Sequence, residues 1–185
     1  MRRSVPALCA LALVLIGCSD SKSDATTETT GAPLCQPNAT EQPESDLPNL
    51  ALIPEAVAAL EAEMGGPQTY FEINATSKLV NLWVALNDGT VAQPWLYFDG
   101  QLSSKDPVSG ATGPTFLASE IQFDPDKLLV PLRKQIPEAI LGSVVLSDQG
   151  SDSVVYEVLV SAQCGGGLDV VVGPDGTVKS VDPVN

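Results

Sequence analysis

The sequence contains no histidine, so several catalytic arrangements are excluded at the outset. A Ser-His-Asp or Cys-His pair needs an imidazole as its general base, and many zinc sites need it as a ligand. The Gly-x-Ser-x-Gly motif that marks the nucleophile of many hydrolases is missing as well. Paired carboxylates remain available, but the acidic residues fall mostly in turns and in a polar N-terminal stretch. The sequence therefore predicts a non-enzymatic protein without cofactor or metal.

Basic side chains are also scarce, with nine Lys and Arg against 23 Asp and Glu. A surface this acidic repels phosphate backbones and anionic headgroups, so we do not expect a nucleic-acid partner. Beyond residue 17, no apolar run approaches the roughly 20 residues that cross a bilayer. Membrane attachment would therefore depend on something other than basic patches or a spanning helix.

The sequence does contain a short apolar run at residues 5–16, directly after two arginines, an order typical of a secretion signal. The run ends in Leu15-Ile16-Gly17-Cys18, which resembles the lipobox of bacterial lipoproteins. The resemblance implies a signal peptide over residues 1–17, cleavage before Cys18, and acylation of Cys18, for example with palmitate. Two acyl chains anchor a protein stably outside the cytoplasm. The alternative is an ordinary signal peptide with a cysteine near its end.

Cleavage before Cys18 would leave 168 residues with seven basic and 23 acidic side chains, a net charge of −16. Residues 18–48 carry the acylated cysteine and are rich in Ser, Thr, Asp, Glu and Pro, so we expect a disordered tether. Residues 49–185 are predicted to form a single domain. In a bacterium with two membranes, Ser19 after the acylated cysteine favours the outer membrane. In an actinobacterium the anchor would lie in the outer leaflet of the cytoplasmic membrane.

Only two cysteines remain outside the signal peptide once Cys18 is acylated, namely Cys35 and Cys164. Disulfides persist in extracytoplasmic compartments, so we predict that these two pair. A loop of this length would stabilise the fold by about 4 kcal/mol in the chain-entropy model. The alternative, a catalytic or metal-bound thiolate, would lack a histidine partner.

The first half of the domain reads as a helix followed by an antiparallel meander. Ile53, Val57, Leu60 and Met64 lie on one helical face, between Pro54 in the first turn and the stop signal Gly65-Gly66. Short stretches rich in β-branched and aromatic residues follow, separated by turn signals. These strands are expected over residues 70–73, 78–86 and 95–98.

The pattern recurs 76 positions later, where Val80, Leu82 and Val84 correspond to Tyr156, Val158 and Val160. A short second helix is expected between Asp124-Pro125 and Pro137. We therefore predict an α+β fold of two tandem helix-plus-antiparallel-sheet units, at about residues 49–103 and 120–183. The two units would share one core or a continuous sheet.

A helix that leads into a small antiparallel sheet, in tandem, resembles the PepSY-like and β-lactamase-inhibitor-protein-like arrangement of secreted bacterial proteins. The segment from Leu168 to Val181 resembles the closing strand, turn and strand of such units. A second resemblance is to actinobacterial lipoproteins of the LppX and LprG type, through residues 98–102 and 123–129. This second resemblance implies a lipid or glycolipid carrier.

Aromatic residues are few, but six of the nine fall in the first unit. Trp83 lies opposite the Val80-Leu82-Val84 face of its strand, and Trp95 shares a face with Tyr97. If these faces coincide, Trp83, Trp95 and Tyr97 form an aromatic strip of the kind enriched at interfaces. The alternative is that this face packs on the other unit.

Together these features predict a membrane-anchored lipoprotein of the cell envelope that acts as a binding module for an envelope protein or another envelope component. The alternative is a lipid carrier.

The intact mass of the mature chain tests the two cysteine predictions together. We expect an N-terminus at acylated Cys18 and a chain two hydrogens lighter than its reduced form, because Cys35 and Cys164 are bonded. An unacylated terminus at another residue would contradict the lipobox. Two reactive thiols would contradict the disulfide.

Overall fold

The computed structural model describes residues 41–150 and 153–184, in which ten antiparallel strands form one sheet. Its strand order is β10-β9-β8-β7-β1-β2-β3-β4, with β5 beside β3 and β6 beside β1. The strands are β1 (Thr69–Ala75), β2 (Leu79–Leu86), β3 (Val91–Phe98), β4 (Gln101–Ser104), β5 (Val108–Ser109), β6 (Phe116–Leu117), β7 (Ala139–Asp148), β8 (Val154–Ala162), β9 (Gly167–Val172) and β10 (Val178–Val184). The helices are η1 (Glu44–Asp46), α1 (Leu52–Met64), η2 (Ala118–Glu120), α2 (Pro125–Leu128) and α3 (Val130–Gln135). The predicted α+β class is confirmed.

The first predicted helix is present as α1, and the sequence signals explain both of its ends. Pro54 lies in the first turn, where a missing N–H costs nothing. At the other end Gly65 adopts φ 83° as a left-handed cap, and the Gly66 N–H donates to the Glu61 carbonyl (2.8 Å). The helix buries Ile53, Val57 and Leu60 against the sheet.

The second helical segment also begins and ends as predicted, but it is divided in two. Asp124 Oδ1 accepts from the Asp126 N–H (3.1 Å) and caps α2. Leu129 then separates α2 from α3, whose second residue, Pro131, has no N–H to continue the helical ladder. The last helical residue is Gln135, two before Pro137.

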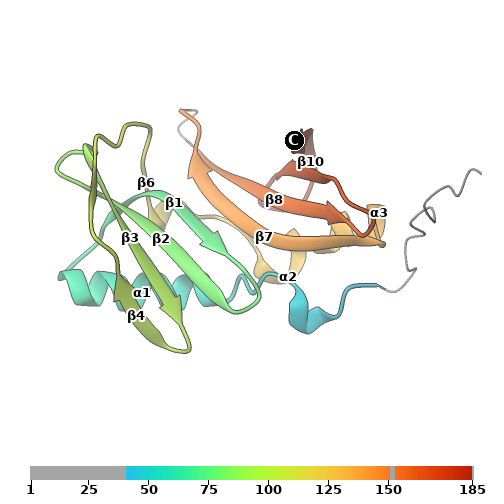
Figure 1. Ribbon diagram of the computed structural model, residues 1–185, viewed down its shortest axis with the longest axis horizontal. Coiled ribbons are helices and arrows are strands. Elements are labelled where there is room, and N and C mark those ends of the chain that lie inside the picture. The colour runs from blue at the N-terminus through green and yellow to red at the C-terminus, as the bar shows by residue number, and fades with distance from the viewer. Residues whose placement is uncertain (1–40, 151–152, 185) are drawn as a thin grey trace, which may run out of the picture. The chain divides into compact units, whose positions relative to one another are not determined.

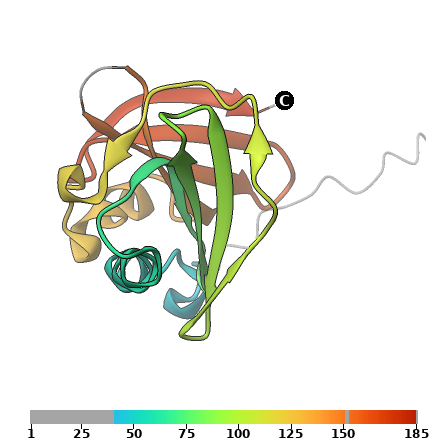
Figure 2. The same ribbon diagram turned by 90° about the vertical axis from the view of Figure 1, so that its left-hand side faces the viewer.

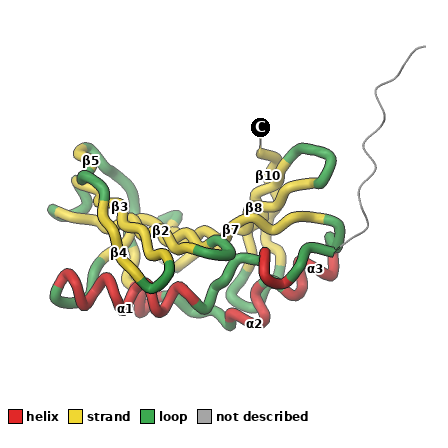
Figure 3. The backbone as a smooth tube through the Cα atoms, turned by 60° about the horizontal axis from the view of Figure 1, so that its bottom comes forward, coloured by secondary structure: helices red, strands yellow, loops and turns green. Residues whose placement is uncertain are grey.

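The α-helices lie on one side of the sheet, as Figure 1 and the end-on view in Figure 2 show. Figure 3 shows the same arrangement, with the helical segments along the bottom of the view and the strands above them. Alternate residues of the central strands point into the space between these layers, where they form one hydrophobic core. Its fully buried strand residues include Tyr70, Ile73, Val80, Leu82, Val84, Val144, Leu146 and Val158.

Two meanders meet in this sheet through β1 and β7. The first meander, β1–β4, follows α1, and the second, β7–β10, follows α2 and α3. Where the two meanders meet, Ile73 of β1 lies opposite Leu146 of β7. The connector expected over residues 103–119 contains the two short strands β5 and β6. The pairing between β1 and β7 therefore joins strands that lie about 70 residues apart in the sequence.

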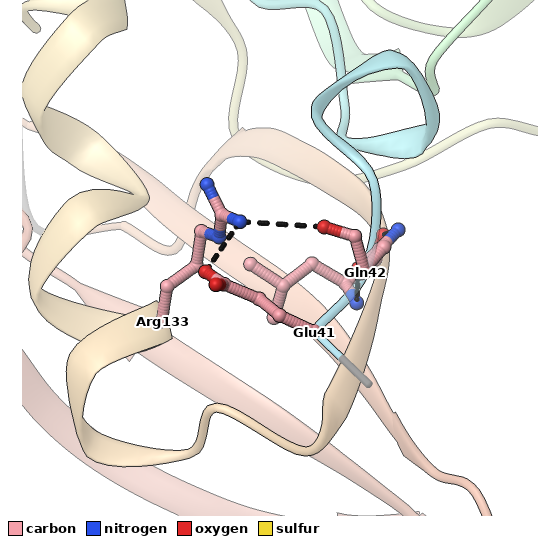
Figure 4. A network of polar contacts seen from close by, with 4 residues as sticks. Glu41, Gln42 and Arg133 are labelled. Carbon is pink, nitrogen blue, oxygen red and sulfur yellow. Dashed lines mark hydrogen bonds and ion pairs between the residues drawn. The ribbon is translucent and has the colours of Figure 1, made fainter. Parts of the chain in front are cut away.

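The folded part begins earlier than residue 49, which corrects the predicted end of the tether. The Gln42 side chain accepts from the Leu141 N–H (2.7 Å) and donates to the Leu141 carbonyl (3.0 Å), as a neighbouring strand would. Arg133 forms an ion pair with Glu41 and donates to the Gln42 carbonyl (3.3 Å), as Figure 4 shows. The amino-acid composition of residues 18–48 could not predict this contact, because the contact depends on a single side-chain amide, that of Gln42, which reaches β7 only in the folded chain.

The turn between β9 and β10 depends on Gly176, which packs against the junction of α2 and α3. Its φ is 79°, and a Cβ there would lie 2.5 Å from the Leu128 carbonyl oxygen. Gly100, in the turn between β3 and β4, has a similar φ of 74° but open space around it.

Alanine substitutions at these two glycines distinguish the cost of backbone strain from the cost of steric overlap. We expect Gly100→Ala to lower the free energy of unfolding by about 1 kcal/mol through the left-handed conformation alone. Gly176→Ala should cost about 2 kcal/mol more, because the backbone of α2 must move. Urea unfolding of both variants measures the difference, and equal losses would contradict this packing.

Candidate functional site

The side of the sheet opposite the helices is the candidate site, and we call it the open face. It consists of the alternate strand residues whose neighbours point into the core. At its centre lie Glu72 and Asn74 of β1, Asn81 and Trp83 of β2, Pro94 and Leu96 of β3, Val145 and Ser147 of β7, and Val155 and Glu157 of β8. These side chains are partly buried.

The predicted aromatic strip does not form, because its members lie on opposite faces. Trp95 lies opposite Leu82, and Tyr97 lies opposite Val80, so both belong to the core side. Tyr97 is only 9% exposed. Trp83 instead lies opposite Pro94, on the open face. The turn between β2 and β3 sets this register, which alternation within each strand cannot reveal.

Two cross-strand rows define the geometry around Trp83. In the first row, Trp83 lies opposite Glu72, which lies opposite Ser147 of β7. In the second row, Asn81, Asn74, Val145 and Glu157 follow one another across β2, β1, β7 and β8. Side chains directly opposite each other in such rows are about 5 Å apart at Cβ, so neighbours in a row touch.

Glu72 is the electrostatically perturbed member of the open face. Burial raises the pKa of its carboxyl above the ordinary value, and the negative charge of Glu157 raises the pKa further. A hydrogen bond from Asn74 acts in the opposite direction and lowers the pKa of Glu72. Glu157 itself accepts a hydrogen bond from Gln149 Nε2 (2.7 Å). The two carboxylates lie diagonally on either side of β7, and neither forms an ion pair within the described residues.

Asn74 carries an acceptor that the described part of the chain leaves unused. Its Oδ1 atom is buried and has no hydrogen-bond partner there. Buried polar atoms are normally satisfied, so this oxygen is one of two exceptions among the described residues, the other being Trp95 Nε1 on the core side.

Glu72, Asn74 and Glu157 were not predicted as site residues. In each strand, buried apolar residues alternate with more polar ones, and this alternation already places Glu72, Asn74 and Glu157 on the side of the sheet away from the core. Their meeting depends on the pairing of β7 with both β1 and β8. That pairing is not visible in any local pattern.

The predicted cysteine sites lie only partly within the described residues. Cys18 and Cys35 lie outside the described residues, so acylation and the Cys35–Cys164 bond stay predictions. Cys164 lies between β8 and β9, beside a hollow of about 410 Å³ with a mainly apolar lining. Ile136, Val160 and Leu168 contribute to that lining.

Comparisons with known proteins identify no family. No family model matches the chain, and no curated protein matches it. One solved structure, described as a "putative lipoprotein" from Clostridium difficile 630, matches with a TM-score of 0.48 and 11% sequence identity. The match covers 75% of this chain and 94% of the other. A likeness of this size establishes neither a family nor a function.

Two further features of the described residues bear on the site. None of their helices has the length and apolar character needed to cross a membrane. In residues 41–150 and 153–184, no three Asp, Glu or Cys side chains gather closely enough to hold a metal ion.

The perturbed carboxyl of Glu72 predicts a pH-dependent effect on stability. Its folded-state pKa is raised, so the folded state binds a proton more tightly and loses stability as pH rises through that pKa. Glu72→Gln removes this loss. Urea unfolding should therefore show that the variant gains stability relative to the natural chain as the pH rises above about 4, the ordinary pKa of a glutamate.

The control is Glu63→Gln, which removes one exposed carboxylate from α1 on the other side of the molecule. The same pH-dependent gain in both variants would show a general effect of net charge and would contradict a specific role of the open face.

Proposed function

We propose that this chain is a non-enzymatic, lipid-anchored protein of the cell envelope and that its open face binds a protein partner. The observation that carries the proposal is an extended sheet face, opposite the helices, which combines Trp83, Leu96 and Val145 with the polar groups of Glu72 and Asn74. Aromatic and apolar groups interspersed with hydrogen-bonding groups are typical of protein interfaces. The lipobox-like segment at residues 15–18 supports the anchoring.

We further propose that the sheet consists of two copies of one unit. Val80, Leu82 and Val84 are buried in β2, and their counterparts 76 positions later, Tyr156, Val158 and Val160, are buried in β8. Asp99-Gly100 turns from β3 to β4, and Asp175-Gly176 turns from β9 to β10. In this interpretation each copy supplies half of the open face, with β1 and β7 side by side at the centre.

The docked segment at Glu41 and Gln42 determines where the tether leaves the domain. Arg133 on α3 and Leu141 on β7 hold it there, so the chain toward Cys18 starts from this point. The central rows of the open face cross β7 at Val145 and Ser147, away from Leu141. The docked contact at Leu141 therefore lies outside these rows.

Site-specific photocrosslinking in intact cells tests the protein-binding role. A benzoylphenylalanine at Asn81, on the open face, should give a discrete crosslinked product of higher mass. The control places the same group at Ala58, an exposed residue of α1. A product at both positions, or at neither, would contradict binding through the open face.

The alternative, a lipid or glycolipid carrier, has one supporting observation, the apolar hollow beside Ile136, Val160 and Leu168. Native mass spectrometry of the purified chain separates the two functions. A lipid-sized adduct that leaves only on denaturation would favour the carrier, whereas the mass of the chain alone would favour the binding module.

A further inference from the structure

The open face has a charge of one sign at its centre. Glu72 and Glu157 lie there, and Asp169 of β9 and Asp182 of β10 extend the acidic character outward. One described cation, Lys105, lies at the edge of this face, because it follows β4 and its N–H donates to the carbonyl of Pro94 (2.9 Å), the residue opposite Trp83. The others lie elsewhere: Lys78 adjoins the start of β2, Lys127, Arg133 and Lys134 lie on the helices, and Lys179 lies on β10 beside the β9–β10 turn.

Two of those cations are already engaged with other carboxylates. Arg133 binds Glu41, and Lys127 binds Asp124. The carboxylates of Glu72 and Glu157 therefore lack a cationic partner within the described residues, although each approaches the other across β7. The cost of this arrangement is visible in the raised pKa of Glu72, to which the charge of Glu157 contributes.

The backbone register places the two acids on either side of β7, in neighbouring cross-strand rows. Glu72 of β1 and Glu157 of β8 flank β7, and two strand spacings separate their strands by about 10 Å. The floor between them consists of Val145 and Ser147, which are smaller than the flanking side chains. A long planar cation above Val145 and Ser147 would lie between the two carboxylates.

Two further groups select what can enter. Trp83 lies directly opposite Glu72, so the two side chains are cross-strand neighbours. Tryptophan faces attract cations, and a planar guanidinium can stack on the ring while it donates to a carboxylate. Asn74 Oδ1, the buried acceptor without a partner, lies beside Glu72 and accepts only from a donor. All of these groups favour a cation with several N–H donors.

We infer that the open face binds an arginine side chain of its protein partner, between Glu72 and Glu157 and against the ring of Trp83. This inference rests on the proposed binding function and specifies the chemistry of the partner. The arginine would supply the positive charge that the acid pair lacks and a donor for Asn74. A lysine would satisfy the charge, but it would lack the planar group that matches both carboxylates.

Binding of a labelled tetra-arginine peptide to the full chain in uncharged detergent tests the inference by fluorescence anisotropy. A tetra-citrulline peptide of the same shape but without charge should not bind. Glu72→Gln and Glu157→Gln should each weaken tetra-arginine binding about tenfold, because each removes a charge-assisted hydrogen bond. The control Glu63→Gln, which removes the same charge from α1, should weaken binding no more than about twofold.

Three outcomes would overturn the inference. Equal weakening by Glu63→Gln would show diffuse attraction to an acidic surface. Undiminished binding of tetra-citrulline would show that charge is not recognised. Displacement of the peptide by millimolar calcium with the same dependence on Glu72 and Glu157 would indicate a metal site. If photocrosslinking at Asn81 nevertheless succeeds, the open face still binds a partner and only its arginine chemistry is wrong.

Discussion

The antiparallel pairing of β1 with β7 is the contact on which the rest of the structure depends. It joins two four-stranded meanders into one sheet, and it aligns Ile73 with Leu146 so that both are buried under the helices. A slip of one residue would turn every core side chain of one meander toward solvent. The same register that builds the core also brings Glu72 and Asn74 beside the strand that separates them from Glu157.

Placement of the α-helices on one side of the sheet gives its two faces different roles. The helix side is filled by apolar residues of α1, α2, α3 and the strands, which supply the stability of the fold. The open face carries a carboxyl with a raised pKa and a buried amide oxygen without a donor, whereas the comparable unsatisfied atom on the helix side is Trp95 Nε1. Such groups are costly unless another molecule satisfies them. The acidic and amide groups that the open face combines with Trp83, Leu96 and Val145 are the basis for proposing binding there.

Local features of the fold could be predicted from the sequence, whereas long-range pairing could not. The ends of α1, the cap at Asp124 and the turn at Asp99-Gly100 depend on neighbouring residues, and the structure confirms them. The separation of Trp83 from Trp95 depends on how β2 and β3 are aligned, and the docking of Gln42 on Leu141 spans 99 positions. The candidate site depends on long-range strand pairing, so Trp83 could be predicted from the sequence but its acidic neighbours could not.

Hydroxyl-radical footprinting of Trp83 in intact cell envelopes tests the central claim most directly, because it reports whether a partner covers the open face. The account predicts that Trp83 is oxidised more slowly in envelopes than in the purified chain. Met64, at the end of α1 on the helix side, serves as the internal reference and should react equally in both samples. Equal oxidation of Trp83 in the two samples would show that nothing covers the open face and would contradict the account.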